Sequence, residues 1–190
     1  MRIVFVTGGS KSGKSSFALK TAESYTGRKA YIATAQALDD EMSERIEAHR
    51  RQRSNLWDTV EEPLHIHKTI SSLTATHEVI IVDCLTLWLS NILLREPQST
   101  NDEVYSTFSK LTDSLTTAKH VNPDGAIILV SNEVGLSIVP DNLLARLFRD
   151  YAGVLNQQVA AVSDEAYLIV SGLSLRLRSL VSGLDIDGVV

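Results

Sequence analysis

The beginning of the chain constrains the fold most, because an apolar run there leads directly into a glycine-rich phosphate-binding motif. Residues 3–6 read Ile-Val-Phe-Val, a pattern that predicts a buried strand. The stretch Gly8-Gly9-Ser10-Lys11-Ser12-Gly13-Lys14-Ser15 follows at once and matches glycine, four residues, and then Gly-Lys-Ser. Residues 16–23 have helical character. A strand, this loop and a helix in that order predict a cradle for phosphate groups.

Each residue type in the motif has a chemical purpose. Glycines at 8, 9 and 13 let the backbone turn tightly and direct its N–H groups toward an anion. A helix that begins near Lys14 adds the positive end of its dipole. We expect Lys14 to reach the β- and γ-phosphates of a nucleotide and the Ser15 hydroxyl to bind Mg²⁺. The alternative is a Gly/Ser-rich turn that binds nothing, and the flanking strand and helix favour the phosphate site.

Composition indicates a single soluble domain over residues 1–190. Hydrophobic residues make up 44% of the chain and charged residues 22%, as in ordinary globular proteins. The net charge of −5 predicts no broad basic surface for nucleic acid. A single cysteine, Cys84, excludes an internal disulfide framework and suits a reducing cytoplasm. No apolar run reaches the roughly 18 residues of a membrane span, and the apolar start is read as a strand rather than a signal peptide. No role is assigned to residues 179–190.

Apolar runs and helical periodicities alternate along the chain. Further strands are predicted at residues 30–34, 79–83, 126–130 and 166–170, whereas 57–62 fits either a strand or a turn. Helices are predicted at residues 39–53, 85–94, 102–119 and 141–162, the last with Asp141 as a cap after Pro140. Alternating strands and helices predict an α/β fold, a mostly parallel sheet flanked by helices.

Asp83 is the candidate metal ligand of this predicted sheet. It ends an apolar strand, and ligands of such folds gather beyond the carboxyl ends of the strands. The alternative is a carboxylate that caps a turn. Because a metal–phosphate site needs an anionic oxygen ligand and Ser15 supplies only a hydroxyl, we favour Asp83 as a partner of Ser15 in Mg²⁺ binding.

His49 is the candidate nucleophile on the predicted helix 39–53. It shares one face with Met42, Ile46 and Arg53, and Arg45 and Arg53 each stand four residues away. On the pattern alone, a packed and hydrogen-bonded histidine at the edge of an apolar stripe is favoured over a nucleophile. Guanidinium groups suit phosphate oxygens, and nearby positive charge leaves the imidazole neutral and able to attack. Solvent-facing or structural roles are expected for the other histidines, His65, His67, His77 and His120.

Two further polar sets have ordinary structural explanations. Asn132-Glu133-Val134-Gly135 follows a predicted strand and fits a polar turn at the same sheet edge. Arg146, Arg149 and Asp150 lie on a predicted helix, where a solvated, ion-paired face is the default.

Taken together, these stretches resemble the bifunctional adenosylcobinamide kinase / adenosylcobinamide-phosphate guanylyltransferase family of cobalamin biosynthesis. The phosphate loop alone is not specific. The helix Asp39-Asp40-Glu41-Met42 with its His49, and the Asn132–Gly135 block, are specific. The resemblance runs from Ile3 to about Arg178 and includes Tyr31-Ile32-Ala33-Thr34-Ala35, Ile138-Val139-Pro140 and Ser171-Gly172.

The resemblance implies a phosphate-loop NTPase fold of RecA-like architecture and two reactions. The aminopropanol hydroxyl of adenosylcobinamide is phosphorylated from ATP or GTP, and GMP from GTP then passes through a histidine to the new phosphate, giving adenosylcobinamide-GDP. The catalytic residues it implies are His49 and Lys14, with Mg²⁺ at Ser15 and Asp83. Nucleotide binding is expected at Gly8–Ser15 and at Ala33, Thr34, Ala35, Arg50, Arg51, Gln52, Arg53, Glu61 and Asp83. A cytoplasmic homotrimer is implied as well.

Two other functions compete with this interpretation. A single-activity small-molecule kinase would need the phosphate loop and Asp83 but would have no use for His49. A GTP-operated switch usually reads guanine with an Asn-Lys-x-Asp stretch, and the matching segment here is Asn132-Glu133-Val134-Gly135.

Overall fold

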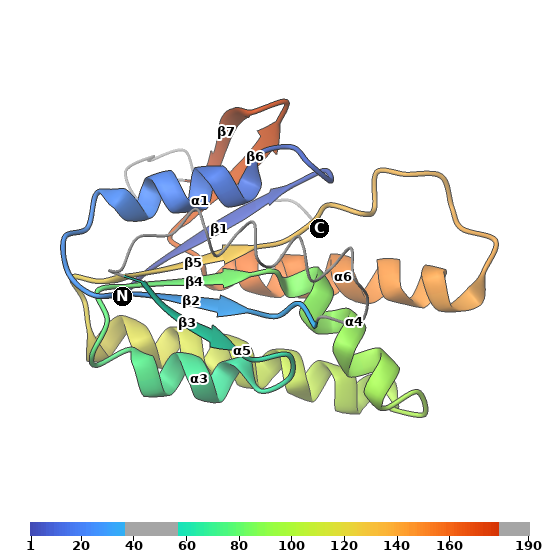
Figure 1. Cartoon of the computed structure of the whole chain (residues 1–190). Coiled ribbons are helices and arrows are strands. Elements are labelled where there is room, and N and C mark those ends of the chain that lie inside the picture. Colours follow the sequence, from blue (N-terminus) through green and yellow to red (C-terminus); the bar gives the residue numbers. More distant parts are fainter. Residues whose placement is uncertain (37–56, 179–190) are drawn as a thin grey trace.

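The computed structural model describes residues 1–36 and 57–178, which form one mixed sheet with helices on both faces (Figure 1). The strands are β1 (Arg2–Gly8), β2 (Lys29–Ala33), β3 (Trp57–Glu61), β4 (Val79–Asp83), β5 (Ala126–Val130), β6 (Glu165–Val170) and β7 (Leu173–Arg178). The helices are α1 (Lys14–Glu23), α3 (Ile66–Leu73), α4 (Leu85–Arg95), α5 (Asn101–Val121) and α6 (Leu143–Val162).

The sheet order is β3-β2-β4-β5-β1-β6-β7. Neighbouring strands from β3 to β6 pair in parallel, and β7 pairs antiparallel with β6. The predicted α/β fold with a mostly parallel sheet is therefore confirmed. Because β1 lies between β5 and β6, the phosphate-binding motif follows an interior strand of the sheet rather than an edge strand.

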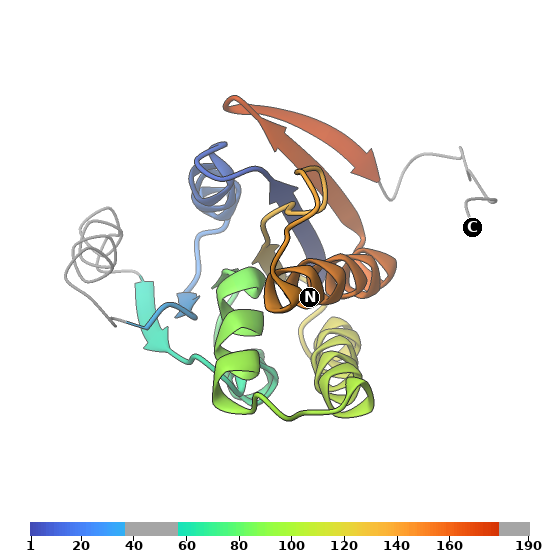
Figure 2. The same ribbon diagram turned by 90° about the vertical axis from the view of Figure 1, so that its right-hand side faces the viewer.

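Two apolar layers hold the fold together, one on each face of the sheet. On one face, alternate strand residues such as Val4 and Val6 pack against Ala18 and Ala22 of α1. On the other face, the intervening strand residues pack against α3, α4, α5 and α6, where Trp88 and Phe108 are fully buried. Figure 2 looks onto the carboxyl edge of the parallel strands and shows α1 separated from these four helices by the sheet. Strands buried on both faces explain why the central runs are continuously apolar.

Most predicted elements are confirmed, and the stretch 57–62 is resolved as the strand β3. The predicted cap Asp141 is wrong. α6 begins at Leu143, and the side chain of Asn142 accepts a 3.2 Å hydrogen bond from the Ala145 N–H. Asn142 adopts the extended backbone that an N-cap needs, so it takes the role one position later. The predicted helix 39–53 lies outside the described residues.

The short helix α3 and the strand β7 were not predicted. α3 is only eight residues long and buries only Ile66 and Ile70, so its apolar face is too short to stand out in the sequence. β7 is exposed along its whole length. Among the described helices, none is both long and apolar enough to cross a membrane.

Candidate nucleotide-binding site

The phosphate loop connects β1 to α1 through two glycines whose lack of a side chain is needed. A Cβ at Gly8 would overlap the carbonyl oxygen of Ile169 on the neighbouring strand β6. Gly13 has φ = 103°, a left-handed conformation that favours glycine, and it is the residue from which α1 begins. The helix dipole of α1 therefore points its positive end at the loop, as an anion site requires.

Lys14, one of two lysines in the loop, is almost fully buried. Its side chain folds back so that Nζ donates a 2.6 Å hydrogen bond to the carbonyl oxygen of Gly9. Burial lowers the pKa of the Lys14 ammonium, and the acidic groups of Cys84 and Asp83 offset only part of this effect. A desolvated ammonium held by one carbonyl gains a stronger partner when phosphate oxygens arrive.

Asp83 and Ser15 meet at the end of β4, as predicted. The Ser15 hydroxyl and the Tyr31 hydroxyl each donate a 2.7 Å hydrogen bond to Oδ2 of Asp83. A carboxylate and a hydroxyl side by side are hard oxygen ligands of the kind that Mg²⁺ prefers. The chemistry and placement of this pair therefore fit a magnesium ion. In this structure the two side chains are hydrogen-bonded directly to each other.

Residues predicted to bind nucleotide form one row across three neighbouring strands. In the sheet register, Ala33 of β2 stands beside both Glu61 of β3 and Asp83 of β4. The fold thus brings together three positions that are far apart in the sequence. The row lies at the carboxyl edge of the sheet, where α/β folds bind their ligands.

Thr34 fixes the shape of this edge. Its fully buried hydroxyl accepts a hydrogen bond from the N–H of Cys84 and donates one to the Cys84 carbonyl, both at 2.8 Å. Its own carbonyl accepts a 2.8 Å hydrogen bond from the amide of Asn91 on α4. The Thr34 side chain therefore ties β2 to β4, next to the Asp83 carboxylate. Burial, with the charge of Asp83, raises the pKa of the Cys84 thiol, which favours its uncharged form.

The segment after β5 is tied to the same site through Asn132 and Asn156. The Asn132 side chain donates to Thr86 at 3.1 Å, and the Asn156 amide donates to the Asn132 carbonyl at 3.2 Å. The Ser131 hydroxyl donates to Asn156 at 2.6 Å. The predicted polar turn at 132–135 is therefore a network between β5, α4 and α6. The sequence assigned no role to Thr86 or Asn156, because no local pattern links them.

Two further contacts fasten the phosphate loop to its neighbours. The Glu133 N–H donates a 3.0 Å hydrogen bond to the Gly8 carbonyl, and the Gly172 N–H donates a 2.8 Å hydrogen bond to the Ser12 carbonyl. Gly172 belongs to the two-residue turn between β6 and β7. The loop is thus held from both sides by segments from the second half of the chain.

The remaining sequence candidates divide into structural residues and residues that the structure does not describe. Arg149 and Asp150 form the expected exposed ion pair at 3.2 Å, and Arg146 donates to the carbonyls of Pro140 and Asp141. The buried His77 is structural, since its Nε2 lies 2.9 Å from Asp58. His49, Arg50, Arg51, Gln52 and Arg53 lie outside the described residues.

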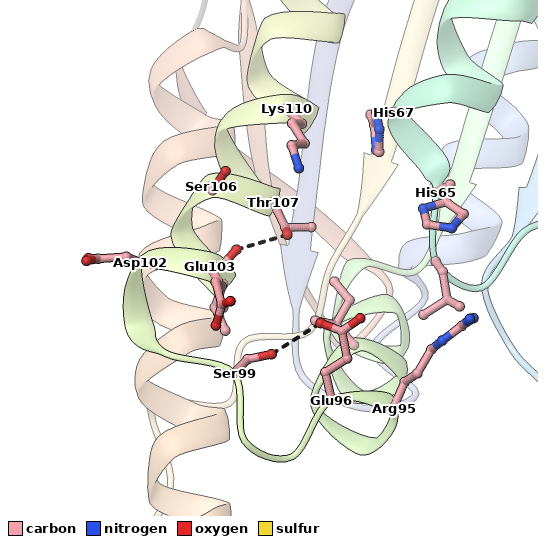
Figure 3. A pocket seen from close by; sticks show the side chains of 13 residues that line it. His65, His67, Arg95, Glu96, Ser99, Asp102, Glu103, Ser106, Thr107 and Lys110 are labelled. Carbon is pink, nitrogen blue, oxygen red and sulfur yellow. Dashed lines mark hydrogen bonds between the residues drawn. The ribbon is translucent and has the colours of Figure 1, made fainter.

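A separate pocket of about 490 Å³ lies between α3, α4 and α5 (Figure 3). Lys110 and His67 extend into it from different helices, and Nδ1 of His67 has no hydrogen-bond partner. Burial lowers the pKa of His67, as do the neighbouring His65 and Lys110. The carboxylates of Glu96 and Glu103 line the same pocket. Its lining includes no residue of the phosphate loop and mixes both charges, so it is not the nucleotide site.

Comparison with known proteins decides the family. Residues 4–177 match the family described as cobinamide kinase / cobinamide phosphate guanyltransferase. The chain belongs to this family. Cobinamide kinase / guanyltransferase is thus the activity class of the chain, as the sequence predicted, and the phosphate loop described above is that of a nucleotide-binding enzyme.

Curated relatives and a solved structure agree with this family and fold. The bifunctional adenosylcobalamin biosynthesis protein CobU of Escherichia coli (strain K12) is 38% identical over 185 residues, covering 93% of this chain and 99% of the relative. CobP of Pseudomonas aeruginosa, described in the same terms, is 40% identical over 174 residues, covering 91% and 95%. The RadB recombinase structure has a TM-score of 0.52 at 15% identity, covering 88% of this chain and 73% of that one. This likeness confirms the RecA-like fold alone.

Proposed function

We propose that this kinase and guanylyltransferase acts on adenosylcobinamide in two successive steps. It phosphorylates the aminopropanol hydroxyl with ATP or GTP and then joins GMP to the new phosphate, which gives adenosylcobinamide-GDP. The observation that carries the proposal is the Ser15–Asp83 pair beside Lys14, at the carboxyl edge of the sheet in a chain of this family.

In the kinase step, the substrate hydroxyl attacks the γ-phosphorus and the nucleoside diphosphate leaves. Backbone N–H groups of residues 8–15 and the N-terminus of α1 hold the phosphates in place. Lys14 neutralises the charge that develops on the transferring group, which is the main contribution of a protein to this reaction. Ser15 and Asp83 would hold Mg²⁺, which supplies further neutralisation of the phosphate oxygens when bound.

In the guanylyl step, a ring nitrogen of His49 attacks the α-phosphorus of GTP and pyrophosphate leaves. A phosphate oxygen of the corrinoid then attacks the same phosphorus, and the nitrogen–phosphorus bond breaks. The covalent intermediate divides one difficult transfer into two easier ones. Arg50, Arg51, Gln52 and Arg53, together with Ala33, Thr34, Ala35 and Glu61, are proposed to bind the nucleotide. The support for His49 is its match to the histidine nucleophile of the family, on the helix predicted at residues 39–53.

We further propose that residues 1–190 act as one domain, in a cytoplasmic homotrimer. The chain length supports the single domain, the single cysteine suits the cytoplasm, and the resemblance to the family supports the trimer. Sedimentation equilibrium at several protein concentrations tests the assembly, since a monomer mass throughout would contradict it.

A labelling experiment separates the two steps. Wild-type protein incubated with GTP labelled at the α-phosphate should retain label on a denaturing gel, and this label should be acid-labile and base-stable. His49→Ala should lose the label and guanylyl transfer while keeping most kinase turnover. His120→Ala is the matched control, because His120 is exposed on α5. Persistence of the label in His49→Ala would move the nucleophile elsewhere. If wild-type protein phosphorylates adenosylcobinamide without ever forming the label, the single-activity kinase is correct.

A further inference from the structure

Two stretches of exposed apolar side chains flank the phosphate loop. Among the described residues, the most exposed large apolar side chains are Ile138 at 93% and Leu136 at 86%, in the segment after β5. On the other side, Leu173 is 76% exposed and Val170 56% exposed, at the turn between β6 and β7. Single exposed apolar residues are ordinary, but grouped ones mark a binding surface.

Both stretches are attached to the loop itself. The segment after β5 is anchored where the Glu133 N–H bonds the Gly8 carbonyl, and the β6–β7 turn is anchored where the Gly172 N–H bonds the Ser12 carbonyl. Figure 2 shows the segment after β5, in gold, beside the blue end of β1 and the red hairpin of β6 and β7. Both apolar stretches are therefore attached to the backbone of the phosphate loop.

Hydrogen bonds within the segment give it a defined shape. The Gly135 N–H donates to Glu133 Oε1 at 2.8 Å, and the Ser137 hydroxyl donates to the Val134 carbonyl at 3.0 Å. Arg146 of α6 donates to the Pro140 carbonyl at 3.0 Å. The exposed side chains are thus presented by a structured loop. Ordering such a loop on binding costs less entropy than ordering a disordered one.

We propose that Leu136 and Ile138 on one side of the phosphate loop, and Val170 and Leu173 on the other, bind the corrin macrocycle of adenosylcobinamide. This rests on the proposed function. The reacting hydroxyl sits at the end of a short arm and must come within about 3–3.5 Å of the γ-phosphate. The macrocycle must then lie against a surface within reach of that arm. Aliphatic side chains suit its broad, partly apolar faces.

The two other occupants of such a surface fit less well. A nucleotide base would need hydrogen bonds to its polar edge, and these four side chains offer none. A second copy of the chain would have no need of the adjacent phosphate, and the state of assembly measured below distinguishes it from the acceptor. The acceptor is the occupant that needs both the apolar contact and the adjacent phosphate.

The proposal is tested with Leu136→Ser/Ile138→Ser for one stretch and Leu173→Ser for the other. Because these side chains are so exposed, the melting temperature should stay at the wild-type value. The KM for adenosylcobinamide should rise at least about ten-fold, while the KM for ATP stays unchanged. Val121→Ser is the matched control, since Val121 is 54% exposed at the end of α5, at the opposite edge of the sheet.

The outcomes separate this inference from the proposed function. An unchanged KM for adenosylcobinamide in both variants overturns the apolar surface but leaves the kinase intact. Wild-type protein that fails to phosphorylate adenosylcobinamide overturns the function, and the surface with it. Sedimentation velocity is run on the same samples, and a loss of assembly in the variants would assign the surface to a second copy instead.

Discussion

Ser15 and Asp83 lie 68 positions apart in the sequence, yet the Ser15 hydroxyl donates a 2.7 Å hydrogen bond to Oδ2 of Asp83. The contact exists because β1 and β4 both pair with β5, so their carboxyl ends lie at one edge of the sheet. The same oxygen accepts a hydrogen bond from Tyr31 of β2. Elements from three parts of the chain thus converge on one carboxylate.

We expect Asp83→Asn to raise the Mg²⁺ concentration needed for half-maximal kinase activity by at least several-fold. An amide is nearly the same size as a carboxylate but lacks the charge that Mg²⁺ prefers. Tyr31→Phe is the matched control, because it removes a hydrogen bond to the same oxygen and keeps the charge. A Mg²⁺ titration of both variants checks this. Superimposable curves for Asp83→Asn and wild type would leave Asp83 a purely structural residue.

Lys14→Ala should lower turnover about 10²–10³-fold, as is typical when one preorganised charge contact at a reaction centre is lost. Stability should not fall, because burial already disfavours the charged form of this side chain and Nζ makes only one hydrogen bond in the described structure. Urea denaturation and both half-reactions are measured together. Lys20→Ala, exposed on the same helix α1, is the control. Unchanged rates in Lys14→Ala would refute the phosphate-loop assignment.

Gly8 and Gly9 should respond very differently to alanine. A Cβ at Gly8 would overlap the Ile169 carbonyl, whereas a Cβ at Gly9 meets no atom within 4 Å. Gly8→Ala should therefore lose about 1–3 kcal/mol of unfolding free energy, because β1 and β6 must move apart. Gly9→Ala should unfold at nearly the wild-type urea concentration. Equal stability of the two variants would contradict this prediction, because it would mean that β6 can shift away from Gly8 at little cost in free energy.

Glu165 should make stability depend on pH in the acidic range. Burial alone would raise the pKa of this carboxyl, but hydrogen bonds from Tyr167 and Arg176 and the charges of Arg2 and Arg176 outweigh it and lower the pKa. The bound proton therefore favours the unfolded state. The stabilisation is fully present above the ordinary pKa of about 4.5 and is lost as the pH falls through the lower, folded value.

Glu165→Gln should cost about 1–3 kcal/mol at pH 7, because charged hydrogen bonds are lost. The difference from wild type should shrink as the pH falls below 4.5. Urea denaturation from pH 3 to 7 measures this, with Glu23→Gln, an exposed residue of α1, as the control. A gap between Glu165→Gln and wild type that stays constant over the whole pH range would contradict the assignment.

Local sequence signals predicted the parts of the fold that depend on local physics. Continuous apolar runs identified the central strands, because strands covered on both faces need no polar residues. β7 was not predicted because it has no buried face and so shows no alternation of apolar and polar burial. The dipeptide Ser171-Gly172 is nevertheless typical of a two-residue hairpin turn, and both residues have positive φ, of 51° and 81°. The helix cap was misplaced by one residue, since Asp141 and Asn142 are both suitable cap residues.

The candidate site was predictable where a general rule applies and not where it depends on pairing between distant segments. The meeting of Ser15 and Asp83 follows from the rule that ligands bind at the carboxyl ends of strands. The bonds of Thr34 to Cys84 and of Gly172 to Ser12 depend on which strands become neighbours. Strand order is a property of the whole chain, so it cannot be predicted from the residues next to Thr34 or Gly172 alone.

The position of β1 between β5 and β6 has a consequence for biosynthesis. On the ribosome, the phosphate-binding motif is translated early, but the strands that flank β1 begin only at Ala126 and Glu165. At about 5–20 residues per second, the nascent β1 waits for several seconds or more with both edges unpaired. The turn that bonds Ser12 is translated later still. Ribosome-bound chains that stop short of Gly172 would therefore carry the complete motif without a finished nucleotide site.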